Sequence, residues 1–559
     1  MNTIHQAVID AIGKDISLSH PPDPKMGDIA IGCFELAKAE GVSPAEAAIA
    51  LASDIQSKAV TLFERVEAIG PYVNIQLNGQ EVARLVLNSL NDSFGTHTIG
   101  DHKKILVEFG CPNPMKAFHL GHLKNLITGE SVARVLENAG YQVVRVNYQG
   151  DVGMHVAKAL WGIFDWKDAF DDVADKSTKE KAEFLGNAYA HGAAAYDQSD
   201  EKKAEVEAYN AKVYAHDASI QDVYDTARAW SLEYFDNIYK RFHTHFDTFY
   251  FESNMYERGL EIVQTYLKKG VFKESEGAVI FEGSKYGLHD RVFVNSKGLP
   301  TYEAKDVALA EQHLKEKPDK IIHVVGKEQT EYFKVVFRAL EEIFPESKGK
   351  EFHLPGGFLQ LKGNQKMSSR TGNIVTGDEL VAMVEDQIAR IMKDAETPVD
   401  QNVCEKVTVA ALVYVMLKAD VTRDVAFDLE ESVSTSGDSG PYLLYIVARI
   451  KGILNKTQNE KIDGQYDIPD TVHAAEKSLL LQLSLYPSAT QSAADQMDPS
   501  HVARYLFTLA QSFNSFYDAC PVLKAEGDER AFRLALIGRV LQTMERGLHL
   551  LGIETVERM

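Results

Sequence analysis

A short apolar run, followed by two prolines and then by helical spacing, constrains the fold of this chain more than any other stretch. The run is Lys104-Ile-Leu-Val-Glu108, and it predicts a buried strand. Pro112 and Pro114 end the strand and predict an extended loop after it. From Leu123 onward the apolar residues recur at helical spacing. Strand, loop and helix in this order are typical of α/β folds.

Two histidines, His119 and His122, stand at the expected start of that helix. A helix start has unpaired backbone N–H groups and the positive end of the helix dipole, which suits a phosphate. Gly121 leaves room for a flat ring against the backbone. A His-x-x-His pair alone is more often structural, and it lacks the spacing and the Glu of a zinc protease helix. The pair therefore indicates nucleotide chemistry only if a second feature supports it.

A basic loop rich in glycine and serine, Lys362-Gly-Asn-Gln-Lys-Met-Ser-Ser-Arg-Thr-Gly372, supplies that second feature. It follows roughly 240 residues later, a spacing expected of the two halves of one α/β domain. A cationic loop suits a charge that develops only in the transition state, such as departing pyrophosphate. Without the histidine motif, this segment would be interpreted as an ordinary basic loop exposed to solvent. Together, His119-Leu-Gly-His122 and Lys366-Met-Ser-Ser-Arg370 resemble the two signature sequences of class I aminoacyl-tRNA synthetases.

Length, cysteines and charge exclude several other classes of protein. The chain has 559 residues, enough for several domains. Its 4 cysteines (Cys33, Cys111, Cys404 and Cys520) are widely spaced, so we expect neither a disulfide framework nor a zinc site. We expect a cytoplasmic protein without membrane contact, because no leader and no membrane-length apolar run is evident. The net charge of −22 disfavours RNA binding without excluding it, since phosphate contacts need only a local basic surface.

The pattern along the chain predicts three domains. Residues 1–97 are expected to form a small α+β domain, with helices over 29–40 and 44–58 and a strand over 71–77. Residues 98–390 are expected to form a Rossmann-type parallel-sheet domain with a solvated helical insertion at about 161–240. The expected strands of this domain include 104–108, 142–147, 278–281, 291–295, 321–325 and 352–354. Each motif outside the insertion is expected to follow the end of such a strand. Residues 391–559 are expected to be all-α.

Further motifs resemble arginyl-tRNA synthetases in particular. They are Glu108-x4-Asn113, Asn147-Tyr-x-Gly-Asp151, Tyr302-x3-Asp306, Phe427-Asp-x-Glu430, Gly440-Pro-Tyr442 with Ala448-Arg449, and the terminal Gly552-Ile-Glu-x-x-Glu-Arg-Met559. The resemblance implies an N-terminal domain that touches the tRNA elbow and a helical C-terminal domain that binds the anticodon. It implies an arginine–tRNA ligase, which uses ATP with Mg²⁺ to make arginyl-adenylate and pyrophosphate. The arginine then passes to the 3'-terminal ribose of tRNA(Arg), releasing AMP. We expect a monomer.

The same resemblance assigns the residues that handle ATP. The implied ATP-binding residues are His119, Gly121, His122, Lys366, Met367 and Ser368. The implied catalytic residues are His119, His122, Lys116, Lys366 and Arg370. Ser369 stands where class I enzymes usually carry a second lysine, and in arginyl enzymes a lysine before the histidine motif is thought to compensate. Lys116 occupies that place.

The expected arginine site consists of acidic, amide and aromatic side chains. A guanidinium is a planar fork of donors that stays charged, and it calls for carboxylates in bidentate geometry. By resemblance, Asp306 and Tyr302 hold the guanidinium, Gln329 lines the same pocket, and Glu108 and Asn113 face the amino-acid end.

Three alternatives remain open at this stage. Another class I synthetase is the first, although a cysteinyl enzyme needs a zinc site and glutamyl or glutaminyl enzymes need a cationic pocket. The second is a catalytically silent tRNA-binding paralogue, which the intact set of His119, His122 and Lys366 disfavours. The third is a simple nucleotidyltransferase, which would not need the long helical C-terminal part.

Overall fold

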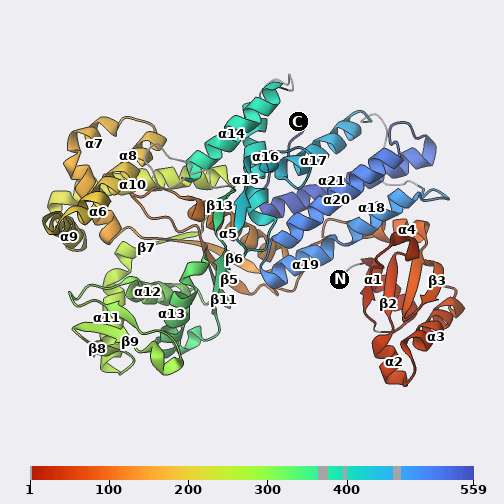
Figure 1. Cartoon of the computed structure of the whole chain (residues 1–559), viewed down its shortest axis with the longest axis horizontal. Helices are drawn as coiled ribbons and strands as arrows, with labels where there is room; N and C mark the ends of the chain where they lie inside the picture. Colours follow the sequence, from red (N-terminus) through yellow and green to blue (C-terminus); the bar gives the residue numbers. More distant parts are fainter. Residues whose placement is uncertain (1–2, 15, 363–375, 395–399, 458–466) are drawn as a thin grey trace.

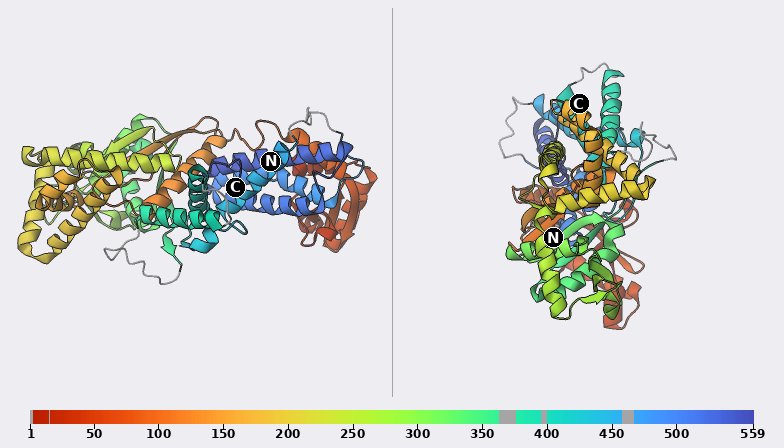
Figure 2. Two further views of the ribbon diagram at one scale, coloured as in Figure 1. Left: turned by 90° about the horizontal axis from the view of Figure 1, so that it is seen from above. Right: turned by 90° about the vertical axis from the view of Figure 1, so that its left-hand side faces the viewer.

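The computed structural model describes residues 3–14, 16–362, 376–394, 400–457 and 467–559 (Figure 1). The molecule is elongated, with the helical insertion at one end and the N-terminal domain at the other (Figure 2). Among the described residues, no helix has both the length and the apolar character that a membrane span requires.

A five-stranded parallel sheet forms the centre of the middle part of the chain, in the order β12-β11-β5-β6-β7. Its strands are β5 (Lys104–Phe109), β6 (Gln142–Gln149), β7 (Thr248–Phe251), β11 (Lys320–Gly326) and β12 (Glu351–Gly356). The strand order reverses between β5 and β11, and open α/β sheets bind ligands at such a switch point. The predicted Rossmann-type sheet is confirmed.

A second sheet, antiparallel and three-stranded, lies beside the first in the order β10-β9-β8. It consists of β8 (Lys273–Ser275), β9 (Ala278–Phe281) and β10 (Arg291–Val294). The expectation that the Tyr302 motif follows a strand of the parallel sheet is therefore wrong, because it follows β10. Three helices surround this small sheet: α11 (Tyr256–Lys268), α12 (Tyr302–Lys315) and α13 (Thr330–Ile343).

Five helices fill the segment between β6 and β7, where the sequence predicts a helical insertion at about 161–240. They are α6 (Met154–Asp165), α7 (Lys167–Val173), α8 (Thr178–Gln198), α9 (Asp200–Tyr214) and α10 (Ala218–Arg241). Their shared apolar core makes the insertion a packed unit.

The C-terminal part is a helical bundle, as predicted. Its helices are α14 (Gly377–Asp394), α15 (Gln401–Leu417), α16 (Leu429–Ser432), α17 (Gly440–Asn455), α18 (Ala474–Ser484), α19 (Tyr486–Gln496), α20 (Ser500–Ala519) and α21 (Gly527–Leu551). In the described part of this stretch a short strand, β14 (Val425–Phe427), pairs in parallel with β13 (Leu359–Leu361). The pair joins the bundle to the part that holds the parallel sheet.

The N-terminal part combines a four-stranded sheet, in the order β1-β2-β4-β3, with helices. Its elements are α1 (Thr3–Ile12), β1 (Leu18–Ser19), β2 (Ile29–Gly32), α2 (Phe34–Glu40), α3 (Pro44–Ser57), β3 (Phe63–Ile69), β4 (Tyr72–Leu77) and α4 (Gly79–Ser89). The single helix expected over 29–40 is wrong, because its first residues pair with β4 as β2. This part packs on the bundle through α4 and α18, where Lys477 Nζ lies 3.0 Å from an Asp28 oxygen (Figure 1).

Helix α5 (Leu120–Asn138) follows β5 and connects the site to the bundle. Near its C-terminal end, the Ser131 hydroxyl donates to the Leu550 carbonyl at 2.9 Å, and Arg134 donates to the His549 carbonyl at 2.9 Å. Both carbonyls lie in the last turn of α21, and that of His549 also accepts from the Gly552 N–H at 3.0 Å. The helix that begins at the histidine motif is thus held by the C-terminal bundle.

Candidate active site

The two histidines lie at the start of α5, as predicted, and they cap it reciprocally. His119 is the N-cap residue, and its Nδ1 accepts from the Gly121 N–H at 3.1 Å and the His122 N–H at 3.4 Å. The Nδ1 of His122 accepts from the His119 N–H at 3.4 Å. The helix start is therefore less open to a phosphate than expected, because His119 occupies these N–H groups. Since each Nδ1 accepts, each neutral ring carries its proton on Nε2.

Burial and a neighbouring lysine keep both rings neutral. Burial, together with the charge of Lys116, lowers the pKa of His119 to about 4. Burial, together with His119 and Lys116, lowers the pKa of His122 well below its ordinary value. The rings stack with their centroids 3.6 Å apart. At neutral pH the pair therefore offers hydrogen-bond donors rather than cations.

Lys116 lies on the loop before α5, with its ammonium 5.4 Å from the centre of the Tyr189 ring on α8. Burial and the charge of Lys158 lower its pKa. Lys366, Met367, Ser368 and Arg370 lie outside the described residues. The described chain resumes beside the histidines, because Thr376 bridges to His119 and the Gly377 N–H donates to the Phe118 carbonyl at 2.8 Å.

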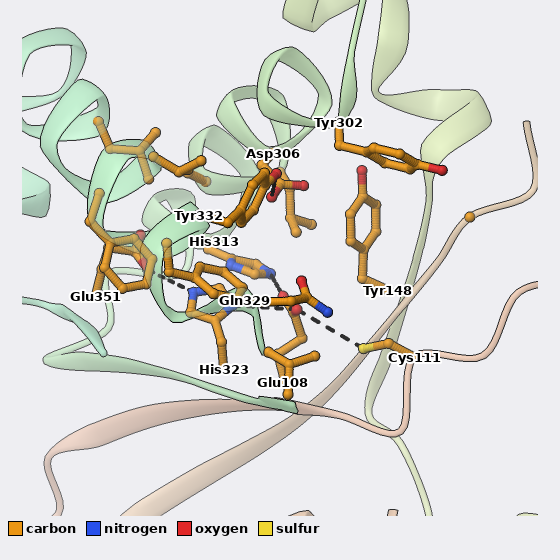
Figure 3. Close-up of a pocket in the computed structure, with 18 of the residues that line it drawn as sticks. Glu108, Cys111, Tyr148, Tyr302, Asp306, His313, His323, Gln329, Tyr332 and Glu351 are labelled. Carbon is orange, nitrogen blue, oxygen red and sulfur yellow. Dashed lines mark hydrogen bonds and ion pairs between the residues drawn. The ribbon is translucent and has the colours of Figure 1, made fainter. Parts of the chain in front are cut away.

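A cavity of about 400 Å³ opens at the carboxyl ends of β5, β6 and β11, against α12 and α13 (Figure 3). All the residues expected to bind arginine line it: Glu108, Asn113, Tyr302, Asp306 and Gln329. Sequence reasoning did not assign several other lining residues to a site: Cys111, Tyr148, Gly150, Glu252, His313, His323, Glu328, Tyr332 and Glu351. Glu108, at the end of β5, and the histidine motif, at the start of α5, thus lie at opposite ends of one Pro-rich loop, whereas Tyr302, Asp306 and Gln329 come from later segments.

A buried histidine between two carboxylates supports one wall of the cavity (Figure 3). His323 Nδ1 lies 3.3 Å from Glu108 Oε1, and its Nε2 lies 2.8 Å from Glu351 Oε2. Burial opposes the charge on His323, but the two carboxylates outweigh it and raise its pKa to about 10. Burial likewise would raise the pKa of Glu108, but His323 and the nearby His313 bring it below its ordinary value. Glu108 is therefore ionised and fixed in place.

The carboxyl of Asp306, unlike that of Glu108, has a raised pKa. Burial, with the nearby charges of Glu108 and Glu252, raises its pKa to about 8, although a hydrogen bond from the Tyr332 hydroxyl at 2.6 Å opposes this. No cationic side chain of the described residues forms an ion pair with Asp306. Glu252, by contrast, is paired with the buried ammonium of Lys305. Of these carboxyls, Asp306 has most to gain from a cation that enters the cavity.

Gly150, directly after β6, is required by the close approach of Asn113. A Cβ atom at this position would lie 2.6 Å from Asn113 Oδ1 and 3.2 Å from Glu252 Oε1. Such contacts are shorter than van der Waals distance, so the glycine allows Asn113 to reach into the cavity.

A parallel sheet of this order, a histidine pair at the start of the helix after its first strand, and a cavity at the switch point define a class I aminoacyl-tRNA synthetase. Family models match almost the whole chain. They describe the catalytic domain of class I tRNA synthetases (R) over residues 84–429, a DALR anticodon binding domain over 443–559, and an arginyl tRNA synthetase N terminal domain over 1–77.

Individual relatives belong to the same family that the family models indicate. The chain is 31% identical to the arginine–tRNA ligase of Treponema denticola, over 98% of this chain and 95% of that one. It is 32% identical to that of Bdellovibrio bacteriovorus, over 97% and 94%. Among solved structures, the fold matches Thermus thermophilus arginyl-tRNA synthetase with a TM-score of 0.79, at 24% identity and over 100% and 99% of the two chains. The chain belongs to the arginyl-tRNA synthetase family, and it charges tRNA with arginine.

Proposed function

We propose that the cavity at the switch point binds L-arginine, with the side chain at Asp306 and the α-amino end toward Glu108 and Asn113. The observation that carries the proposal is that separate segments of the chain bring these residues, with Tyr302 and Gln329, to one acidic cavity. The guanidinium carries only donors, and an ionised Asp306 offers two acceptor oxygens in matching geometry. Tyr302 lines the same cavity and is 56% exposed, so it borders both the cavity and the solvent.

The buried charges favour this orientation. Lys305 and His323 already neutralise Glu252 and Glu108 in part, while Asp306 has no cationic partner in the described chain. A buried ion pair stabilises a complex only when the geometry satisfies the remaining hydrogen bonds. The Oε2 atom of Glu108 is buried without a hydrogen-bond partner in the described part, so it is ready to accept from a donor of the substrate.

ATP is the proposed second substrate, with Mg²⁺ bound to its phosphates. The arginine carboxylate attacks the α-phosphorus, giving arginyl-adenylate and pyrophosphate. No protein nucleophile is needed, so this chain contributes positioning and charge stabilisation. His119 and His122 donate from Nε2 to phosphate oxygens as charge builds up, and Lys116 adds a cation beside them. By family resemblance, Lys366 and Arg370 pair with the departing pyrophosphate, and Gly121, Met367 and Ser368 contact ATP.

The tRNA is then proposed to lie along the bundle and the N-terminal domain, with its terminal ribose at the adenylate. Arg449 on α17 lies over the rings of Tyr445 and Tyr517, at 4.6 Å and 5.3 Å, and donates to Asn514 at 3.0 Å. Aromatic and guanidinium planes of this kind suit unstacked bases. Arg533 on α21 is not available for such a contact, because it is buried against Glu476. We further propose a cytoplasmic monomer with domain boundaries near residues 97 and 390.

The test is L-arginine binding by isothermal titration, with Asp306→Asn and Gln329→Ala beside the wild type. We expect both variants to bind arginine more weakly, and wild-type affinity in both would contradict the assignment. A separate assay follows ATP–pyrophosphate exchange with and without tRNA. The family often needs tRNA for activation, so we expect exchange only when tRNA is present.

A further inference from the structure

Tyr148 belongs to a motif that the reaction described above leaves without a role. It lies near the end of β6, where side chains alternate between the two faces of the sheet. Asn147 and Gln149 bond to each other at 2.8 Å on one face, and Asn147 also donates to the Phe109 carbonyl at 3.0 Å. Tyr148, between them, lines the cavity on the other face.

The hydroxyl of Tyr148 is buried and has no hydrogen-bond partner in the described chain. In Figure 3 it points toward the ring of Tyr302. The hydroxyl of Tyr332 in the same cavity differs, because it is bonded to Asp306. A buried hydroxyl without a partner destabilises the free protein, since it has given up its bonds to water.

The charged groups around the Tyr148 hydroxyl decide which kind of hydrogen-bond partner fits it. Burial, together with Glu252, Asp306 and Glu108, raises the pKa of Tyr148 well above its ordinary value. The phenol therefore stays neutral at any ordinary pH, and its oxygen keeps lone pairs that can accept a hydrogen bond. Carboxylates around it favour a donor that carries positive charge. A guanidinium has five N–H groups, more than the two oxygens of Asp306 can satisfy.

We propose that Tyr148 is an arginine-binding residue whose hydroxyl oxygen accepts a hydrogen bond from the guanidinium. This rests on the proposed assignment of the cavity to arginine. It adds a neutral acceptor from β6 to the carboxylate that α12 provides, so the guanidinium is held from two sides. The same contact gives the hydroxyl oxygen, which has no partner in the described chain, a hydrogen bond.

The test variant is Tyr148→Phe in the full-length chain, examined by thermal unfolding and by titration with L-arginine. We expect the Tm of the free protein to stay the same or rise, because the unpartnered hydroxyl is gone. We expect the Kd for arginine to rise about 10- to 100-fold, as for one hydrogen bond to a charged group. The KM for ATP should not change.

The matched control is Tyr256→Phe on α11. The Tyr256 hydroxyl lies outside the cavity, 3.3 Å from the Tyr214 carbonyl and 3.2 Å from His216. Its loss should lower the Tm and leave the Kd for arginine unchanged. An unchanged Kd in Tyr148→Phe, or an equal rise in both variants, would overturn the proposal. If Asp306→Asn also binds arginine normally, the assignment of the cavity itself has failed.

Discussion

The state of Asp306 predicts that arginine binding releases a proton. Its pKa of about 8 in the free protein means that the carboxyl is mostly protonated at neutral pH. A guanidinium beside it favours the ionised form, so its pKa falls when arginine binds. The direction of the pH dependence follows from this. The affinity for arginine rises with pH up to the pKa of Asp306 in the free protein and levels off above it.

The size of the change in arginine affinity follows from the ionised fraction of Asp306. With a pKa of about 8, about 1% of Asp306 is ionised at pH 6 and about half at pH 8. The apparent Kd is the intrinsic value divided by this fraction, so it falls about 50-fold between pH 6 and pH 8. At pH 7, about 0.9 proton is released for each arginine bound.

Calorimetry in two buffers of different ionisation enthalpy measures this release. The heats should differ in proportion to the protons released, and Asp306→Asn should abolish the difference. In Glu252→Gln the difference should persist but shrink, because the nearby charge of Glu252 contributes to the raised pKa of Asp306. A Kd independent of pH from 6 to 8, with equal heats in both buffers, would refute the reasoning.

Three further predictions concern the walls of the cavity and the histidine motif. His323→Leu leaves Glu108 buried without its main cation, so urea unfolding should show a loss of about 3–5 kcal/mol, and a stable variant would contradict the ion pair. Gly150→Ala should displace Asn113 and raise the KM for arginine about 10-fold or more, with the KM for ATP as the control. Lys116→Met should lower kcat for charging by about 10- to 1000-fold with an unchanged Tm. An undiminished kcat would contradict a role for Lys116 in the reaction.

Local patterns in the sequence predict much of this fold. The unit from Lys104 to Asn138 is predictable because a buried strand, two prolines and a helical repeat are each local signals. The error at Ile29–Gly32 has a physical cause. A short apolar run fits either a helix or a strand, and only pairing with the distant strand β4 decides between them. The placement of β10 in a separate sheet has another cause, because β10 pairs with the preceding strand β9, with Arg291 opposite Phe281, and not with a strand of the parallel sheet.

The site residues that belong to a sequence motif were predictable, and the other residues that line the cavity were less so. His323 had a usable signal, because a histidine inside the apolar run Ile321-Ile-His-Val-Val325 must find a buried partner. Tyr332 had none, since a tyrosine on an amphipathic helix is ordinary, and its role comes from the packing of α13 against α12. The pKa of Asp306 depends on burial and on carboxylates from other segments, which no local pattern reports.

The most direct test of the central claim is attachment of radiolabelled amino acids to tRNA with ATP and Mg²⁺, using arginine, lysine, glutamate and cysteine in parallel. We predict charging with arginine alone, lost in His122→Ala and in Asp306→Ala, with both variants folded as judged by Tm. Charging with a different amino acid, or undiminished charging by Asp306→Ala, would contradict the assignment of the acidic cavity to arginine.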